Sequence, residues 1–318
     1  MNILQILLTT LGVIKGTDER MDAKYTAILA KQLESVKVKT YDIVYPKLKA
    51  RLFIPVDNSA DTGAETVTYR QWDAFGMAQI IANYADDIPL VDALCEEFTQ
   101  KIQSLGLGYQ YSIQDLRRSA MSGAQLDQRR ARQCRRGVEQ SIENIAANGH
   151  TAGGLTGIAN NSNVTLVSPT TGTWSSATGA QMVADMMKLT SAMVIANLET
   201  FEPTDILLDI ASYQRFSTTR ISTTGDTGKT ALEAFKESDP YGVNVSSWNK
   251  LALADAAGTG PRAICYHKSP DVLTLEIPQE FEIFPPQQDN LAFKVPAHAR
   301  TGGVIMYYPI GASYMDGL

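Results

Sequence analysis

The amino-acid sequence predicts an α+β protein, with long helical and long strand-like stretches in separate parts of one chain. Three observations support this fold class. Residues 113–148 carry a long helical pattern, β-type residues gather at 48–72, and they gather again at 272–308. With 318 residues, of which 44% are hydrophobic, the chain can bury a large core and is expected to form more than one domain.

The charge content of the chain argues against several classes of protein. Charged residues make up 19% of the sequence, below the roughly 25% that is usual for soluble domains. The 28 Lys and Arg residues against 34 Asp and Glu residues give a net charge of −6, which disfavours an electrostatic nucleic-acid binder. So low a charge content is unusual for a large monomer, because a monomer needs a well-solvated surface.

The cysteines and histidines do not predict a cofactor or metal site. The three cysteines are odd in number, far apart and without CxxC spacing, which fits a reducing cytoplasm. His150, His267 and His298 have no partner at metal-ligand spacing, so we interpret them as structural or surface residues. No cofactor and no metal are expected.

The first residues of the chain predict an amphipathic helix. Apolar residues recur at helical spacing over 1–14, among them Leu4, Leu7, Leu8 and Leu11. The segment lacks a positive n-region and is shorter than the about 20 residues that span a bilayer, so neither a signal peptide nor a membrane anchor is expected. The apolar stripe either packs on the chain's own core or belongs to an arm that buries it on a neighbouring subunit. The terminal position favours the arm.

Residues 36–72 have the character of strands, and strands at 48–56 and 65–72 predict a long β-hairpin. The hairpin carries the basic residues Lys47, Lys49, Arg51 and Arg70. These residues either form a solvated face or meet an acidic neighbour. The solvated face is favoured, because exposed ion pairs are weak.

Helices are predicted at 90–105 and at 113–148. The second would be a rod of about 54 Å at 1.5 Å per residue. Ser112 can cap it, with Asp115 completing a variant of the capping box, and Gly149 can end it.

The surface of the long helix is rich in arginine, because it holds seven of the chain's fourteen. They are Arg117, Arg118, Arg129, Arg130, Arg132, Arg135 and Arg136. Contact with DNA phosphates is one interpretation, but the chain is acidic and no aromatic residues are interleaved, so ion pairs between subunits are favoured. Gly123 and Gly137 each cost a helix about 1 kcal/mol relative to alanine, so they mark bends or close packing.

An uncharged stretch follows the long helix. Residues 144–184 are 41 residues without Asp, Glu, Lys or Arg, although many are polar. Interface cores are depleted in charge, so this stretch indicates contact with protein; an exposed Ser/Thr-rich loop is the alternative.

The remaining residues predict a compact α/β layer and then return strands. Helices are expected at 181–198, 212–216 and 231–235, with strands at 206–210, 272–284, 292–295 and 303–308.

One string resembles a nucleotide-binding motif. Gly228, Lys229 and Thr230 match the end of a P-loop, but the motif also needs a glycine five residues before Gly228, where this chain has Thr223. No GxSxG elbow or other catalytic constellation occurs, so no enzyme is predicted.

Taken in order, these features resemble the major capsid proteins of tailed bacteriophages: an arm, a long hairpin, a very long helix, an α/β domain and return strands. Short strings match one branch of that family. They are Arg51-Leu-Phe-Ile-Pro-Val56, Asp73-Ala-Phe-Gly-Met-Ala78, Ile80-Ile-Ala-Asn-Tyr-Ala-Asp-Asp-Ile-Pro89, Gly153-Gly-Leu-Thr-Gly-Ile-Ala-Asn160 and Thr230-Ala-Leu-Glu-Ala-Phe-Lys-Glu-Ser-Asp-Pro240.

The resemblance implies the tailed-phage major capsid protein fold, which encapsulins share. Its parts would be an N-terminal arm at 1–39, an extended β-hairpin loop at 40–73, a peripheral domain at 74–180 with a spine helix at 113–148, an axial domain at 181–261, and return strands at 262–318 that complete the peripheral domain.

The resemblance also implies a function. The protein would assemble with itself into hexamers and pentamers of an icosahedral head that encloses double-stranded DNA without sequence-specific binding. It would be made in the host bacterial cytoplasm and reside in the virion. Portal, scaffolding and decoration proteins are expected partners, and a scaffold would be a separate protein because the chain begins at the arm. Some members form Lys–Asn cross-links from the extended loop, but no matching asparagine or glutamate is found here.

Two alternatives stay open. An encapsulin-like compartment would carry an enzyme cargo in place of DNA, and a nucleotide-dependent enzyme would lose nucleotide binding on Lys229→Ala. For the capsid interpretation, the candidate inter-subunit contact residues are Leu4, Leu7, Leu8, Leu11, Lys47, Lys49, Arg51, Arg70, Arg129, Arg132 and Arg136.

Overall fold

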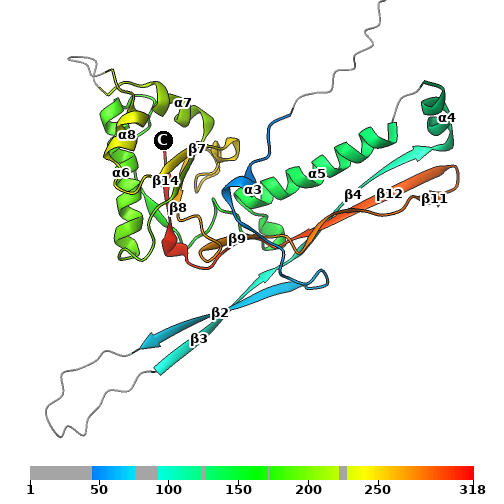
Figure 1. Cartoon of the computed structure of the whole chain (residues 1–318), viewed down its shortest axis with the longest axis horizontal. Helices are drawn as coiled ribbons and strands as arrows, with labels where there is room; N and C mark the ends of the chain where they lie inside the picture. The colour runs from blue at the N-terminus through cyan, green and yellow to red at the C-terminus, as the bar shows by residue number, and fades with distance from the viewer. Residues whose placement is uncertain (1–44, 76–91, 123–125, 171, 222–227) are drawn as a thin grey trace, which may run out of the picture. The chain divides into compact units, whose positions relative to one another are not determined.

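A computed structural model describes residues 45–75, 92–122, 126–170, 172–221 and 228–318 (Figure 1). The chain divides into two compact units, Met1–Lys47 and Leu48–Leu318. All elements described below belong to the second unit. They include long helices and several sheets, so the predicted α+β fold class is confirmed.

A mixed five-stranded sheet and three helices form one part of this unit (Figure 1). In spatial order the strands are β5 (Thr165–Val167), β14 (Ala312–Asp316), β8 (Arg262–Tyr266), β6 (Asp205–Leu208) and β7 (Asn244–Ser247). The helices are α6 (Gly179–Ala196), α7 (Ile210–Thr218) and α8 (Ala231–Ser238). Helix α6 packs on β14, β5 and β8, and α8 packs on α6 and α7. Trp174, Met186, Phe216 and Phe235 lie in the shared core and are fully buried.

A long antiparallel ladder carries the arginine-rich helix. Strands β4 (Gln103–Ser112) and β12 (Ala292–Thr301) pair along their whole length. On the other side of β12 lie β10 (Gln279–Ile283) and β11 (Gln287–Asp289). Helix α4 (Ile113–Ser122) contacts β4, and helix α5 (Leu126–Asn148) packs on both β4 and β12.

Two smaller sheets complete the described part of the chain. Strands β1 (Val56–Asp57), β9 (Leu273–Glu276) and β13 (Gly303–Met306) form a three-stranded sheet. Strands β2 (Thr66–Phe75) and β3 (Asp92–Lys101) form a hairpin of ten residue pairs. Short helical turns are α3 (Ala50–Phe53), η1 (Thr151–Gly153), η2 (Asn249–Leu251) and η3 (Pro309–Gly311).

The end signals predicted for the long helix are confirmed at the start of α4 and at the end of α5; residues 123–125, between these two helices, lie outside the described residues. The hydroxyl of Ser112 accepts a hydrogen bond from the Asp115 amide at 3.0 Å, and the Asp115 carboxylate accepts one from the Ser112 amide at 3.4 Å. At the other end Gly149 has φ +69°, and an added Cβ would lie 2.5 Å from the carbonyl oxygen of Leu155. Gly137 marks close packing as expected, because a Cβ there would lie 2.7 Å from a methyl carbon of Leu107. Gly123 lies outside the described residues.

The predicted hairpin is wrong in its pairing. Residues 48–56 do not pair with 65–72; they form α3 and the first residue of β1, and β2 pairs instead with β3. The helix expected at 90–105 is also wrong, because the chain there forms β3 and the start of β4. Leu94 and Phe98 are four residues apart and therefore fit a helix face, but Phe98 stacks across the hairpin on Tyr69 with ring centroids 5.3 Å apart.

The predicted return segment contributes to more than one sheet. Strands β8 and β14 belong to the five-stranded sheet together with β6 and β7, while β10 to β12 extend the long ladder. Strand β5, which precedes α6 in the chain, also joins the five-stranded sheet. A boundary at residue 261 therefore divides a continuous sheet.

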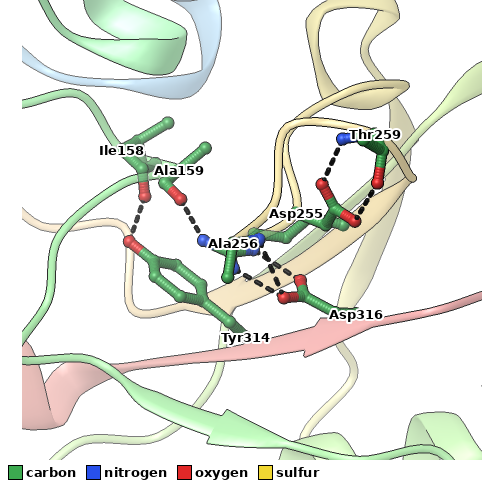
Figure 2. A network of polar contacts seen from close by, with 8 residues as sticks. Ile158, Ala159, Asp255, Ala256, Thr259, Tyr314 and Asp316 are labelled. Atoms are coloured by element: carbon green, nitrogen blue, oxygen red, sulfur yellow. Dashed lines mark hydrogen bonds and ion pairs between the residues drawn. The ribbon is translucent and has the colours of Figure 1, made fainter.

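A buried polar network joins the five-stranded sheet to the turn after α5 (Figure 2). Arg262 is 5% exposed and donates from Nε to Oδ1 of Asp316 at 2.6 Å and from Nη2 to Oδ2 at 2.7 Å. Its Nη1 donates to the carbonyl of Ala159, and the Tyr314 hydroxyl donates to the carbonyl of Ile158. The Arg262 guanidinium also lies over the Tyr314 ring, 4.6 Å from its centroid. The network stabilises the junction between α5 and strands β8 and β14.

Within the described ranges, no helix is both long and apolar enough to cross a membrane. The same part of the chain contains no group of three or more His, Cys, Asp or Glu side chains arranged to hold a metal ion.

Candidate interaction surfaces

The β2–β3 hairpin exposes apolar side chains on both of its faces. Trp72 is 68% exposed and lies opposite Cys95, whereas Leu94 is 55% exposed and lies opposite Asp73. Since neighbouring residues of a strand alternate between faces, Trp72 and Leu94 point to opposite sides. A two-stranded ribbon is marginally stable alone, and exposed apolar groups on both faces indicate contact with another molecule.

The base of the hairpin is attached to its own chain. Tyr69 contacts Tyr307 edge-on with ring centroids 4.9 Å apart, and Gln100 donates from Nε2 to the carbonyl of Gly302 at 3.1 Å. Farther along, the candidate residue Arg70 pairs with Glu97 on the opposite strand, with Nε and Oε1 2.7 Å apart. Arg70 therefore has a partner within the hairpin.

A single carboxylate holds the segment that precedes the hairpin. Glu143 of α5 is 3% exposed and accepts hydrogen bonds from the amides of Lys49 at 2.9 Å and Ala50 at 2.7 Å. It also accepts one from Nε1 of Trp248 at 2.7 Å. Glu143 thus connects α3, α5 and the residue before η2.

The candidate residues Lys49 and Arg51 also bind their own chain. Lys49 donates from Nζ to the carbonyl of Ser247 at 2.6 Å. Arg51 pairs with Glu280 at 2.7 Å and with Glu139 at 3.3 Å. The hydrogen bond and charge of Arg51 lower the pKa of Glu280 below its ordinary value.

Helix α5 presents an arginine surface, which we define as Arg129 and Arg132. Arg129 and Arg132 are exposed, and neither makes an ion pair or hydrogen bond among the described residues. Arg136 is half-buried. The neighbouring Arg130 turns instead toward the ladder, where it donates to the carbonyl of Gln110 at 2.6 Å. Arg129 and Arg132 therefore offer positive charge that the described part of the chain does not neutralise.

Of the remaining candidate contact residues, the structure describes only Lys47. Leu4, Leu7, Leu8 and Leu11 lie outside the described residues. Lys47 is exposed and belongs to the first compact unit.

The uncharged stretch is partly buried and partly on the surface. Trp174 is fully buried and donates from Nε1 to Asp185 at 3.1 Å, so this part of the stretch packs in the core. Residues 160–163 line a pocket of about 430 Å³ beside the hairpin residues Tyr69 and Gln71, and no charged residue lines it. Part of the stretch therefore packs within its own chain and part lies at the surface, and contact with another protein stays a prediction.

The partial nucleotide-binding motif has a structural role in the described part of the chain. The hydroxyl of Thr230 accepts a hydrogen bond from the Glu233 amide and begins helix α8, with the Glu233 carboxylate completing a capping box. Lys229 pairs with Glu237 at 2.6 Å. Thr230 is thus used as a helix N-cap, and Lys229 has a partner in its own chain.

Sequence reasoning missed two apolar surface features. Trp72 was expected within a strand, and alternation along 65–72 could have placed it opposite Tyr69 and Gln71, on the outer face. Ile195 and Leu198 end a predicted amphipathic helix, yet they are 73% and 86% exposed. Periodicity does not reveal this, because α6 ends at Ala196 and Leu198 lies in the turn that follows.

Comparison with known proteins identifies the class to which this fold and these surfaces belong. A sequence model of the family described as major capsid protein matches residues 76–318. The chain belongs to this family, and the resemblance noted from the sequence is confirmed. The family description makes it a structural protein of a capsid.

Solved structures of phage capsids share the fold. A structure described as the capsid of Myoviridae phage XM1 matches with a TM-score of 0.80 and 16% identity over 91% of this chain and 98% of that chain. A protein of Mycobacterium phage Ogopogo matches with a TM-score of 0.62 and 13% identity, over 91% and 98%. The capsid of a native GTA particle matches with a TM-score of 0.63 and 10% identity, over 89% and 94%. A comparison with curated protein sequences found no match.

Proposed function

We propose that this protein is a shell subunit that assembles with itself into hexamers and pentamers of an icosahedral phage head around double-stranded DNA. The main support for this proposal is the β2–β3 hairpin, because it exposes Trp72 and Leu94 on opposite faces of a two-stranded ribbon. A neighbouring copy that covered the hairpin would bury both side chains. The net charge of −6 fits a subunit that encloses DNA without binding it strongly.

Each part of the chain has a role in this proposal. Residues 1–39 form the arm, and the extended loop, placed at 40–73 from the sequence, includes the hairpin as far as Lys101. Helix α5 and the β4–β12 ladder form the peripheral domain, and the five-stranded sheet with α6 to α8 forms the axial domain. The arginine surface makes ion pairs between copies. Portal, scaffolding and decoration proteins are the other partners, with synthesis in the host cytoplasm and residence in the virion.

Electron microscopy tests the proposal directly. The purified chain, concentrated or co-expressed with the other head proteins, is expected to yield closed shells or hexamers and pentamers. A chain that stays monomeric at high concentration would contradict it. Particles that contain DNA fit a phage head, and particles that contain only a protein cargo would favour a cellular compartment instead.

The arm can be tested separately. Deletion of residues 1–16 is expected to reduce the yield of shells much more than it lowers the melting temperature of the unassembled chain, because the apolar stripe would be buried on a neighbour. Normal shells from the truncated chain would show that the arm is dispensable.

A further inference from the structure

The turn that ends helix α6 has a strained backbone. Leu198 and Glu199 have φ of 50° and 62°, and both lie in the left-handed region although neither is glycine. A bulky side chain is rarely found there, because its Cβ approaches the following carbonyl oxygen. Strain of this kind gathers at functional sites, where another contact offsets its cost.

A buried polar atom without a partner lies next to the strained residues. Asn197 is 3% exposed, and its Nδ2 donates to the carbonyl of Phe201 at 2.7 Å. Its Oδ1 is buried and has no hydrogen-bond partner in the described part of the chain. Buried acceptors of this kind are few in native proteins, so the turn has a second unfavourable feature in the free chain.

The same turn exposes two large apolar side chains. Leu198 is 86% exposed and Ile195 is 73% exposed, and they lie on either side of Ala196, the last residue of α6. The only charged residue on the exposed side of α6 is Lys188, whose Nζ donates to the carbonyl of Ser168 at 2.8 Å. Exposed apolar groups at the end of a helix face with little charge are typical of the centre of a protein interface.

Acidic residues border these apolar groups. Glu199 and Glu202 are exposed, and neither carboxylate makes an ion pair or hydrogen bond among the residues described. We define Ile195, Leu198, Glu199 and Glu202 as the α6-exit surface. It requires a partner that is apolar at its centre and positive at its rim.

The chain itself supplies matching charge. We propose that the α6-exit surface of one copy binds beside the arginine surface of α5 in a second copy, an inference that rests on the proposed shell function. Glu199 and Glu202 would face the guanidinium groups of Arg129 and Arg132, whose forked geometry suits carboxylates. Two different surfaces would then meet, and a contact of that kind can repeat from copy to copy around a ring.

The first test uses a substitution that should weaken assembly without lowering the stability of the folded chain. Asparagine tolerates left-handed backbone angles better than leucine, so Leu198→Asn is expected to leave the melting temperature of the unassembled chain unchanged or raised. Shell formation, followed by sedimentation and electron microscopy, is expected to need at least about tenfold more protein, because the apolar contact is lost. Thr200→Asn, an exposed polar residue of the same turn, is the matched control and should assemble as the wild type does.

The second test reverses the charges. Glu199→Arg and Arg132→Glu are each expected to reduce the yield of shells, and the double variant is expected to restore it. A double variant no better than the single ones would overturn the proposal, as would normal assembly of Leu198→Asn. If the wild-type chain itself forms no shells, the proposed function fails; if wild type and Leu198→Asn assemble alike, this inference fails alone.

Discussion

Glu143 is a buried carboxylate whose two oxygens accept hydrogen bonds from two backbone amides and one indole. Its sequence context, a polar stretch of an arginine-rich helix, predicts a solvated residue. The donors come from Lys49, Ala50 and Trp248, at sequence separations of roughly a hundred residues. A contact between such distant segments has no local sequence signal, and that is why the sequence does not predict it.

We expect Glu143→Ala to lower the free energy of unfolding by about 3 kcal/mol or more, because its three donors lose a charged acceptor. Urea unfolding of the unassembled chain, followed by tryptophan fluorescence, measures this loss. Glu139→Ala is the matched control on the same helix, since Glu139 pairs with the half-exposed Arg51 and should cost less than about 1 kcal/mol. Equal losses in the two variants would contradict the role assigned to Glu143.

Glu276 is a second buried carboxylate, 1% exposed, and burial raises its pKa above the ordinary value of 4.5. The charge of Asp57, its partner in the β1–β9 register, raises the pKa further, against opposing hydrogen bonds from Thr274 and Tyr307. The folded chain therefore holds this proton to a higher pH than the unfolded chain does. Its contribution to stability is complete below about pH 4.5 and is lost as the pH rises through the raised pKa.

We expect Glu276→Gln to be more stable than the wild type at neutral pH, since the amide stays uncharged. The difference in unfolding free energy should grow with pH, by about 1.4 kcal/mol for each unit by which the pKa is raised. Denaturation from about pH 4 to about pH 8 measures it, and the values below pH 4.5 serve as the internal control. A difference that does not change with pH would contradict this account.

At the scale of helices and strands, the sequence predicts an element best where residues within a few positions decide where it begins and ends. Ser112 with Asp115 marks the start of α4, and Gly149 marks the end of α5. Both signals could be found in the sequence because caps and left-handed glycines depend on residues within a few positions. The segment at 90–105 was not predictable, since its apolar spacing fits a helix as well as a strand. Its pairing with β2 decides the outcome, and that pairing is a tertiary contact.

Substitution by alanine should change the free energy of unfolding in opposite directions at Gly137, within α5, and at Gly149, directly after it. Gly149→Ala is expected to cost at least about 1–2 kcal/mol, because φ is +69° and the new Cβ would meet backbone atoms. Gly137→Ala meets only the end of the Leu107 side chain, which is 43% exposed and can rotate, so a gain of up to about 1 kcal/mol in helix propensity is expected. Thermal unfolding of both variants measures the contrast. Similar losses at the two sites would contradict it.

For the whole molecule, the surface chemistry fits the proposed assembly better than it fits a free monomer. Low charge, an uncharged stretch of 41 residues and a two-faced apolar hairpin are all unfavourable for a monomer in water. The succession of a long helical region, an α/β region and later strands was predictable from the sequence. The distribution of residues 262–318 over more than one sheet was not, because it depends on which strands meet after the chain returns.

We expect Trp72→Ser to leave the unfolding free energy of the unassembled chain within about 0.5 kcal/mol of the wild type, since the side chain is 68% exposed. The yield of shells should fall several-fold, because the side chain would be buried on a neighbour. Thr68→Ser lies on the same face of the same strand and is the control. Unchanged assembly of Trp72→Ser would argue against the hairpin as a contact.

The three tryptophans give the natural chain a built-in optical probe of its association state. Trp174 and Trp248 are fully buried, and Trp72 is the one that water reaches. In free subunits a soluble quencher such as acrylamide should therefore extinguish mainly the emission of Trp72, at the red edge of the spectrum. As copies come together, that fraction should disappear and the emission should shift to the blue. Assembly kinetics could then be followed in solution without attaching a dye.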